Sequence, residues 1–261
     1  MKTLLSFSGG LDSTYVLWKL LKTTDDEITA MNIDFRLSKV AIDIQVEHCG
    51  YQEIAGRDIV SWLKRNVRDF TYIEHKAYDT LPDEENVIYF IRRAIPWLNA
   101  AKYDRICVGL QYDETGIEVM AKDPGERRGV DRRKVMNNIF SEAKRGELWI
   151  PMETWREAKP HAVASLPKDL LDMVVTCVNP SIGQNGNITD CGSCFRCLYV
   201  EKIQHMLGNG MTPDNVLDWR INEGIKTGVW RGIRQVINGN LDPITIRYFD
   251  SRFKNERTWD V

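Results

Sequence analysis

Leu4-Leu5-Ser6-Phe7-Ser8-Gly9-Gly10-Leu11-Asp12-Ser13-Thr14 is the stretch that decides the fold of this 261-residue chain. It opens as an apolar run typical of a strand, and it is followed by apolar residues spaced on one helix face: Val16, Leu17, Leu20 and Leu21. A glycine pair between a strand and a helix lets the backbone approach a ligand, because glycine has no Cβ. The unpaired N–H groups at a helix start favour an anion. The stretch therefore predicts a phosphate loop over residues 8–13, although Asp12 or Ser13 can also serve as a plain N-cap.

Apolar runs and helical patterns alternate along the chain beyond this loop. Strands are expected at Ile28–Asp34, Asp69–His75, Arg105–Gly109 and Glu147–Pro151, and helices at 51–67, 83–102 and 133–144. Pro96 is expected to kink or divide the second of these helices. Because the strands are separated by helices, we expect an α/β fold with a doubly wound, mainly parallel sheet.

The second half of the chain is expected to be helical. Leu170, Leu171, Val174 and Val175 have the spacing of core positions on a helix, and further helices are expected near 195, at 212–226 and at 229–238. We therefore expect two parts, an α/β domain over residues 1–160 and a helical region over residues 161–261.

Composition bounds the class of protein. The net charge is −2 and 43% of the residues are hydrophobic, which suits an enzyme with a sizeable core and argues against a nucleic-acid partner. No run of 18 apolar residues occurs, and an apolar strand stands where a signal peptide would be. We therefore expect a cytoplasmic protein with no membrane partner. In that compartment, its six cysteines are expected to be thiols or metal ligands before disulfides.

Four of the cysteines form a second motif, with the spacing C-x13-C-x2-C-x2-C: Cys177, Cys191, Cys194 and Cys197. Two-residue gaps allow thiolates to converge on one ion, and four sulfurs with no open position predict a structural Zn²⁺. An iron–sulfur cluster is the main alternative, but the next cysteine of a ferredoxin motif would fall at Glu201. Idle thiols are the remaining alternative.

The hexapeptide Ser8–Ser13 resembles the PP-loop of the ATP pyrophosphatase superfamily, and it lacks the Gly-Lys-Ser/Thr ending of a Walker A loop. Members include GMP, asparagine and NAD synthetases, and tRNA-modifying ligases and thiolases. The resemblance implies an adenine nucleotide alpha hydrolase-like fold that cleaves ATP between its α- and β-phosphates, with AMP transferred to a substrate oxygen. It implies catalytic roles for Asp12 and Ser13, and it places ATP contacts at Ser8, Gly9, Gly10, Leu11, Asp12, Ser13, Asp34 and Gly109.

A lysine after the fifth expected strand extends this resemblance. Lys159-Pro160-His161-Ala162-Val163 matches a lysine of many PP-loop enzymes, with His161 where glutamate is typical. The match implies that Lys159 binds phosphate and stabilises charge on the α-phosphate as pyrophosphate leaves. Lysine before a helix is also a common solubilising residue.

The loop at 109–133 follows a strand end, where doubly wound folds bind their ligands. Its candidates for substrate contact are Gln111, Asp113 and Glu114. Two adjacent carboxylates near a triphosphate would suit Mg²⁺, although most residues of so polar a loop are expected to be solvated.

The phosphate loop and the cysteine motif together resemble the 7-cyano-7-deazaguanine synthase family over residues 3–205. The resemblance implies a homodimeric carbon–nitrogen ligase that adenylates 7-carboxy-7-deazaguanine for attack by ammonia, in queuosine biosynthesis. The substrate loops depart from that family. Asp34-Phe35-Arg36 stands where Tyr-Gly-Gln is usual, no Tyr-Pro-Asp-Cys-Arg occurs, and Arg220–Val261 is an additional tail.

Three other functions remain open on the sequence. One is a tRNA-modifying PP-loop enzyme, a thiolase or a ligase; another is a homologue that transfers a deazaguanine to a different acceptor. The third is a nucleotide sensor without catalysis, against which the retention of Ser8, Asp12 and Ser13 argues.

Overall fold

A parallel sheet forms the centre of the molecule, for which a computed structural model describes residues 1–34, 43–77, 86–111, 127–177, 180–182, 188–193 and 195–219. Within these residues the sheet has five strands in the order β3-β2-β1-β4-β5, and every neighbouring pair is parallel. The strands are β1 (Lys2–Ser6), β2 (Glu27–Asp34), β3 (Thr71–Lys76), β4 (Arg105–Cys107) and β5 (Glu147–Trp149). The chain winds outward from β1 in one direction to β3, and then in the other to β5. The carboxyl end of β1 therefore lies at the switch point where such sheets bind ligands.

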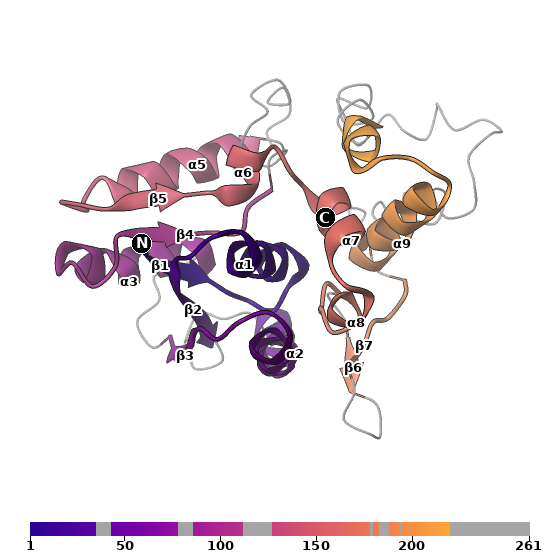
Figure 1. Cartoon of the computed structure of the whole chain (residues 1–261), viewed down its shortest axis with the longest axis horizontal. Helices are drawn as coiled ribbons and strands as arrows, with labels where there is room; N and C mark the ends of the chain where they lie inside the picture. The colour runs from indigo at the N-terminus through magenta and orange to yellow at the C-terminus, as the bar shows by residue number, and fades with distance from the viewer. Residues whose placement is uncertain are drawn as a thin grey trace, which may run out of the picture.

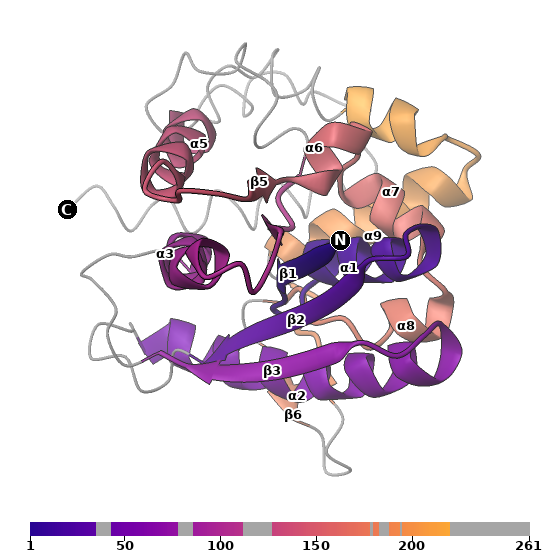
Figure 2. The same ribbon diagram turned by 60° about the vertical axis from the view of Figure 1, so that its left-hand side comes forward.

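Helices cover both faces of this sheet, which confirms the doubly wound α/β fold. The first helices are α1 (Leu11–Thr23), α2 (Asp43–Asn66), α3 (Asn86–Asn99) and α5 (Arg127–Phe140). One core cluster joins α1 and α2 to one face, and a second joins α3 and α5 to the other. Figure 2 shows the strands passing between these two pairs. Tyr15, Leu17, Leu20 and Ile59 are among the side chains that are fully buried in the first cluster.

The C-terminal elements pack on the α1 side of the sheet (Figure 1). They are α6 (Pro151–Trp155), α7 (Lys159–Ser165), α8 (Lys168–Leu171), the hairpin β6 (Ser181–Ile182) and β7 (Ile188–Thr189), and α9 (Phe195–Gly208). Val163, Leu198 and Ile203 belong to the same buried cluster as α1 and α2. A single core thus crosses residue 160, and the division of the chain into two parts there stays a prediction.

Several element boundaries differ from those expected. α2 begins at Asp43, eight residues before the expected start at 51, and α5 begins at Arg127, six residues before the expected start at 133. Pro96 lies inside α3 and does not divide it, since only the last three residues of the helix follow it. The helix expected around 170–175 is wrong beyond Leu171: Val174 and Val175 are buried, but lie after α8 ends.

The described C-terminal residues end in a helical segment at 213–219, part of the helix expected at 212–226. The helix expected at 229–238 lies outside the described residues. Among the helices that the structure describes, none is both long enough and apolar enough to cross a membrane.

Candidate active site

The phosphate loop connects β1 to α1 and is closed by its own serines. Gly9 has a φ of +75°, which favours glycine, and Gly10 is the N-cap residue of α1. The Ser8 N–H donates to Ser13 Oγ at 3.1 Å, and the two hydroxyl oxygens are also 3.1 Å apart. The Gly10 N–H points at Ser8 Oγ, 3.3 Å away, and Ser13 Oγ donates to the Gly10 carbonyl at 3.2 Å. The loop is thus a tight nest of N–H and O–H groups at a helix start, as a phosphate site requires.

Close backbone contacts explain why glycine stands at two positions of the site, one in the phosphate loop and one just after β4. A Cβ on Gly9 would lie 2.6 Å from the Gln52 carbonyl oxygen of α2. A Cβ on Gly109, just after β4, would lie 3.0 Å from both Ser13 Cα and Ser13 N. Gly109 therefore acts by letting the chain pass against the start of α1. The Leu11 side chain is buried in the core, so this residue can offer a ligand only its backbone.

Lys159 reaches the phosphate loop from the far half of the chain. Its Nζ lies 3.0 Å from Asp12 Oδ2, and both side chains are about one-fifth exposed. Gln111 links the two, because its Nε2 donates to Asp12 Oδ2 at 3.3 Å and its Oε1 accepts from the Lys159 backbone N–H at 3.2 Å. Gln111 is completely buried. An ammonium, a carboxylate and a carboxamide therefore meet beside the N–H groups of the loop.

His161 caps the start of α7. The Ala158 N–H donates to His161 Nδ1 at 3.2 Å, which caps the first turn of α7 just as an N3 glutamate would. With Nδ1 accepting, Nε2 carries the proton and donates to Asp214 Oδ1, 3.0 Å away. These two hydrogen bonds hold the start of α7, which is where Lys159 lies.

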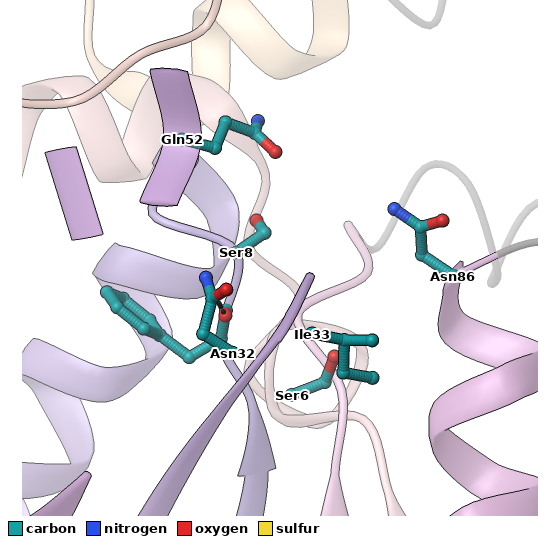
Figure 3. A pocket seen from close by; sticks show the side chains of 7 residues that line it. Ser6, Ser8, Asn32, Ile33, Gln52 and Asn86 are labelled. Atoms are coloured by element: carbon teal, nitrogen blue, oxygen red, sulfur yellow. Dashed lines mark hydrogen bonds between the residues drawn. The ribbon is translucent and has the colours of Figure 1, made fainter. Parts of the chain in front are cut away.

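A recess lined by uncharged side chains, five polar and two apolar, adjoins the loop (Figure 3). Its lining residues are Ser6, Phe7, Ser8, Asn32, Ile33, Gln52 and Asn86. Asn32 is buried on β2 and its Nδ2 donates to the Phe7 carbonyl at 3.1 Å, which fixes the strand end beside the loop. The amides of Gln52 and Asn86 border the recess from α2 and α3. This site can hydrogen-bond a neutral polar group next to a bound phosphate.

Asp34, the other predicted ATP contact, ends β2 at the same edge of the sheet and is largely buried. Its backbone carbonyl accepts from the Ala77 N–H at 2.9 Å. The predicted Mg²⁺ ligands, Asp113 and Glu114, lie outside the described residues, as does Cys194. Within the described loop, Asp12 is therefore the carboxylate that a hard cation would meet.

Three of the four motif cysteines converge. The Sγ atoms of Cys177, Cys191 and Cys197 all lie within 4.8 Å of one another. The Cys191 N–H points at Cys177 Sγ at 3.3 Å, and Ser193 Oγ donates to Cys191 Sγ at 3.5 Å. Hydrogen bonds to sulfur favour its anionic form, so the donor set of soft thiolates fits a thiophilic metal. The site joins the β6–β7 hairpin to the start of α9 (Figure 1).

The sequence analysis missed the residues around the recess. Asn32 carries a signal, because it is an amide within an otherwise apolar strand. Gln52 and Asn86 carry none, since each is one polar residue of a helix and only the tertiary fold brings it to Ser8. Glu157 also carries no signal in the sequence. It lies two residues before Lys159, and its carboxylate pairs with Lys19 of α1.

Comparison with solved structures gives distant likenesses, of which two are described here. No protein-family model matches the sequence, and no curated protein matches it either. The U34-tRNA thiolase NcsA from Methanococcus maripaludis, solved with its [4Fe-4S] cluster, is similar at 13% identity and a TM-score of 0.38, over 93% of this chain and 74% of that one. A predicted subunit of tRNA methyltransferase from Methanocaldococcus jannaschii is similar at 14% identity and a TM-score of 0.27, over 82% and 92%. At such identities and TM-scores, neither likeness says what this chain binds or catalyses.

Proposed function

We propose that the chain is an ATP-dependent enzyme of the PP-loop type, which adenylates an oxygen of its substrate and releases pyrophosphate. One observation carries the proposal. Lys159 Nζ and Asp12 Oδ2 lie 3.0 Å apart at the mouth of the Ser8–Ser13 loop, and Gln111 bridges them. A cation, a carboxylate and several N–H donors thus converge where a triphosphate chain would be held.

Each group has a chemical task in this reaction. To bind the β- and γ-phosphates, which leave as pyrophosphate, the N–H and O–H groups of Ser8, Gly10 and Ser13 would exchange the hydrogen bonds that they make with one another for bonds to phosphate oxygens. The Lys159 ammonium would offset negative charge that develops on the α-phosphate as the substrate oxygen attacks and the α–β bond breaks. Bound Mg²⁺ would supply further charge neutralisation, with Asp12 as the described carboxylate available to it.

We propose that the acceptor of AMP is a substrate oxygen, which adenylation converts into a leaving group. This chemistry is shared by the two substrate classes that the resemblances imply: the carboxylate of a 7-carboxy-7-deazaguanine, followed by attack of ammonia, and a base carbonyl of a tRNA. The deazaguanine assignment is weakened by the departures around Asp34 and after Gln111. We therefore propose the shared adenylation step, with the acceptor to be identified by experiment.

The convergent cysteines are proposed to bind structural zinc. Four thiolates around one zinc, at about 2.3 Å from it, place neighbouring sulfurs about 4 Å apart. The separations of up to 4.8 Å among Cys177, Cys191 and Cys197 suit that arrangement. In a four-iron cluster each thiolate binds a different iron and the sulfurs are spread more widely. A homodimer, which the family resemblance implies, and a cytoplasmic location, which the composition favours, remain proposals.

ATP turnover tests the proposed reaction. The protein is incubated with ATP and Mg²⁺ in two arms, one with 7-carboxy-7-deazaguanine and ammonium, the other with total tRNA, and nucleotides and acceptors are quantified by mass spectrometry. We expect AMP and pyrophosphate, with consumption of one acceptor. Asp12→Ala should lower turnover at least about 100-fold, whereas Asp172→Ala, at an exposed ion pair, should leave it unchanged. ADP and phosphate as products would contradict the proposal.

A further inference from the structure

A second ion pair joins α1, the helix that carries Asp12, to the segment that immediately precedes Lys159. Lys19 Nζ lies 2.6 and 2.7 Å from the two carboxylate oxygens of Glu157, and these side chains are 23% and 17% exposed. The Tyr15 hydroxyl donates to Glu157 Oε2 at 2.9 Å. Lys19 Nζ also lies 4.3 Å from the centre of the Trp155 ring, which adds a cation–π contact. We call Tyr15, Lys19, Trp155 and Glu157 the latch.

The latch shares one helix face with the catalytic carboxylate. Asp12, Tyr15 and Lys19 are spaced i, i+3 and i+7 on α1, and residues at this spacing project from the same side of a helix. Seven helical residues span about 10 Å. The segment from Trp155 to Lys159 is therefore fixed at two points along α1, one at the phosphate loop and one two turns further on.

The two ion pairs have opposite polarity. Along α1 the order is acid then base, Asp12 then Lys19, and the partners in the facing segment are the base Lys159 and the acid Glu157. Sliding the segment so that Glu157 approached Asp12 would bring two largely buried carboxylates together, which is costly. The pattern therefore specifies a single register between this segment and α1.

The latch is also chemically inert. Burial, together with the charge and the hydrogen bond of Glu157, raises the pKa of Tyr15 well above its ordinary value, so its hydroxyl stays protonated and keeps donating. Glu157 accepts from both Tyr15 and Lys19, and so it is satisfied inside the protein rather than offered to a ligand. These properties suit a fixed support rather than a catalytic group.

We propose that Lys19 and Glu157 are positioning residues, which hold Lys159 against the phosphate loop by locking the segment before α7 onto α1. The inference rests on the proposed function for its kinetic consequence and on the geometry alone for its structural one. Misplacement of a catalytic group by about 1 Å can cost about 100-fold in rate. Loss of either latch charge should thus act on kcat through Lys159, with little effect on the KM for ATP, because the loop that binds the phosphates is untouched.

The kinetic test uses three variants and a matched control in the full chain. Lys19→Met and Glu157→Gln should each lower the kcat of pyrophosphate release about 100-fold, with the KM for ATP changed only a few-fold. Lys19→Arg, which keeps the charge and the cation–π contact, should restore most of the rate. Lys22→Met removes a neighbouring α1 lysine whose ammonium lies 4.7 Å from the centre of the Trp18 ring, and this variant should match the wild type.

A second measurement does not depend on activity. The rate at which acetic anhydride acetylates the Lys159 amine, with acetate as the leaving group, is measured by peptide mass spectrometry in each folded variant. We expect Lys159 to react several-fold faster in Glu157→Gln and in Asp12→Asn than in the wild type or Lys22→Met. An unchanged Lys159 labelling rate in Glu157→Gln would overturn the proposal, whether or not the chain turns over ATP. Absence of AMP formation by the wild type would instead contradict the proposed function and leave the labelling to decide the latch.

Discussion

Gly109 lies at the tightest approach between the strand end of β4 and the phosphate loop. Its backbone runs against the start of α1, where an added Cβ would lie 3.0 Å from Ser13 N and 3.2 Å from the Asp12 carbonyl carbon. Both neighbours are backbone atoms, which cannot rotate away as a side chain can. Gly109 also precedes Gln111 by two residues, so its placement controls how Gln111 reaches Asp12 and Lys159.

Gly109→Ala should therefore strain the site as well as the fold. We expect the free energy of unfolding to fall by about 1–3 kcal/mol, the usual range for an inserted methyl that forces a backbone shift, with a parallel loss of pyrophosphate release. Gly208→Ala is the matched control, because a Cβ there meets nothing within 4 Å and the residue ends α9. Urea unfolding measures the free energy of unfolding of both variants. Equal stability of the two variants would show that the contact at Ser13 relaxes freely.

At the scale of elements, the β6–β7 hairpin has little hydrophobic contact of its own in the part of the chain that the structure describes: Ile188 packs against the main core, and the cysteine site lies beside the hairpin. Its strands have only two residues each, and Ile182 is 53% exposed. So short a hairpin is not stable alone. Cys177 precedes the hairpin, Cys191 follows it and Cys197 lies in the first turn of α9, so one ion would tie all three segments together.

We expect elemental analysis to find one zinc per chain in a colourless protein, and chelation to lower the thermal midpoint because the binding free energy contributes to folding. Cys191→Ser should lose the metal, whereas Ser193→Ala should retain it, since Ser193 contacts sulfur only through a hydrogen bond. A brown protein that contains iron would refute the zinc assignment.

At the scale of the whole molecule, sequence patterns predicted the features that are formed by residues close together in the chain. The strand–loop–helix of residues 4–21 and the clustering of cysteines are encoded by spacing, and the structure brings together Asp12, Gln111 and Lys159 from three predicted strand ends. The latch was not predictable, because Lys19 and Glu157 are 138 residues apart and each reads as an ordinary surface charge. The recess at Asn32 and Gln52 likewise exists only once β2 and α2 are packed.

At the amino ends of the strands, away from the phosphate loop, one carboxylate links three strands: that of Asp26, which immediately precedes β2. It accepts from Thr3 Oγ1 at 3.1 Å, pairs with the guanidinium of Arg105, and lies 3.4 Å from the N-terminal ammonium, so it joins β1, β2 and β4. Burial alone would raise the pKa of Asp26, but Thr3, Arg105 and the N-terminus outweigh it and lower the pKa below its ordinary value of 3.8. A carboxyl whose pKa is lower in the folded state stabilises the fold above the unfolded pKa, and this contribution is lost as the pH falls through the folded pKa.

Asp26→Asn should therefore lower the free energy of unfolding by about 1–2 kcal/mol at neutral pH, through lost charged hydrogen bonds. The deficit should begin to shrink as the pH falls below about 4, because the carboxyl of the unfolded chain then takes up a proton, and it should vanish once the pH is below the lowered pKa of the folded carboxyl. Asp172→Asn, which removes an exposed ion pair with Lys168, should cost no more than about 0.5 kcal/mol. Urea unfolding from pH 7 to pH 2 distinguishes the two variants. A deficit for Asp26→Asn that stayed constant across this range would mean that the effect comes from packing, since only a lost ionisation vanishes in acid.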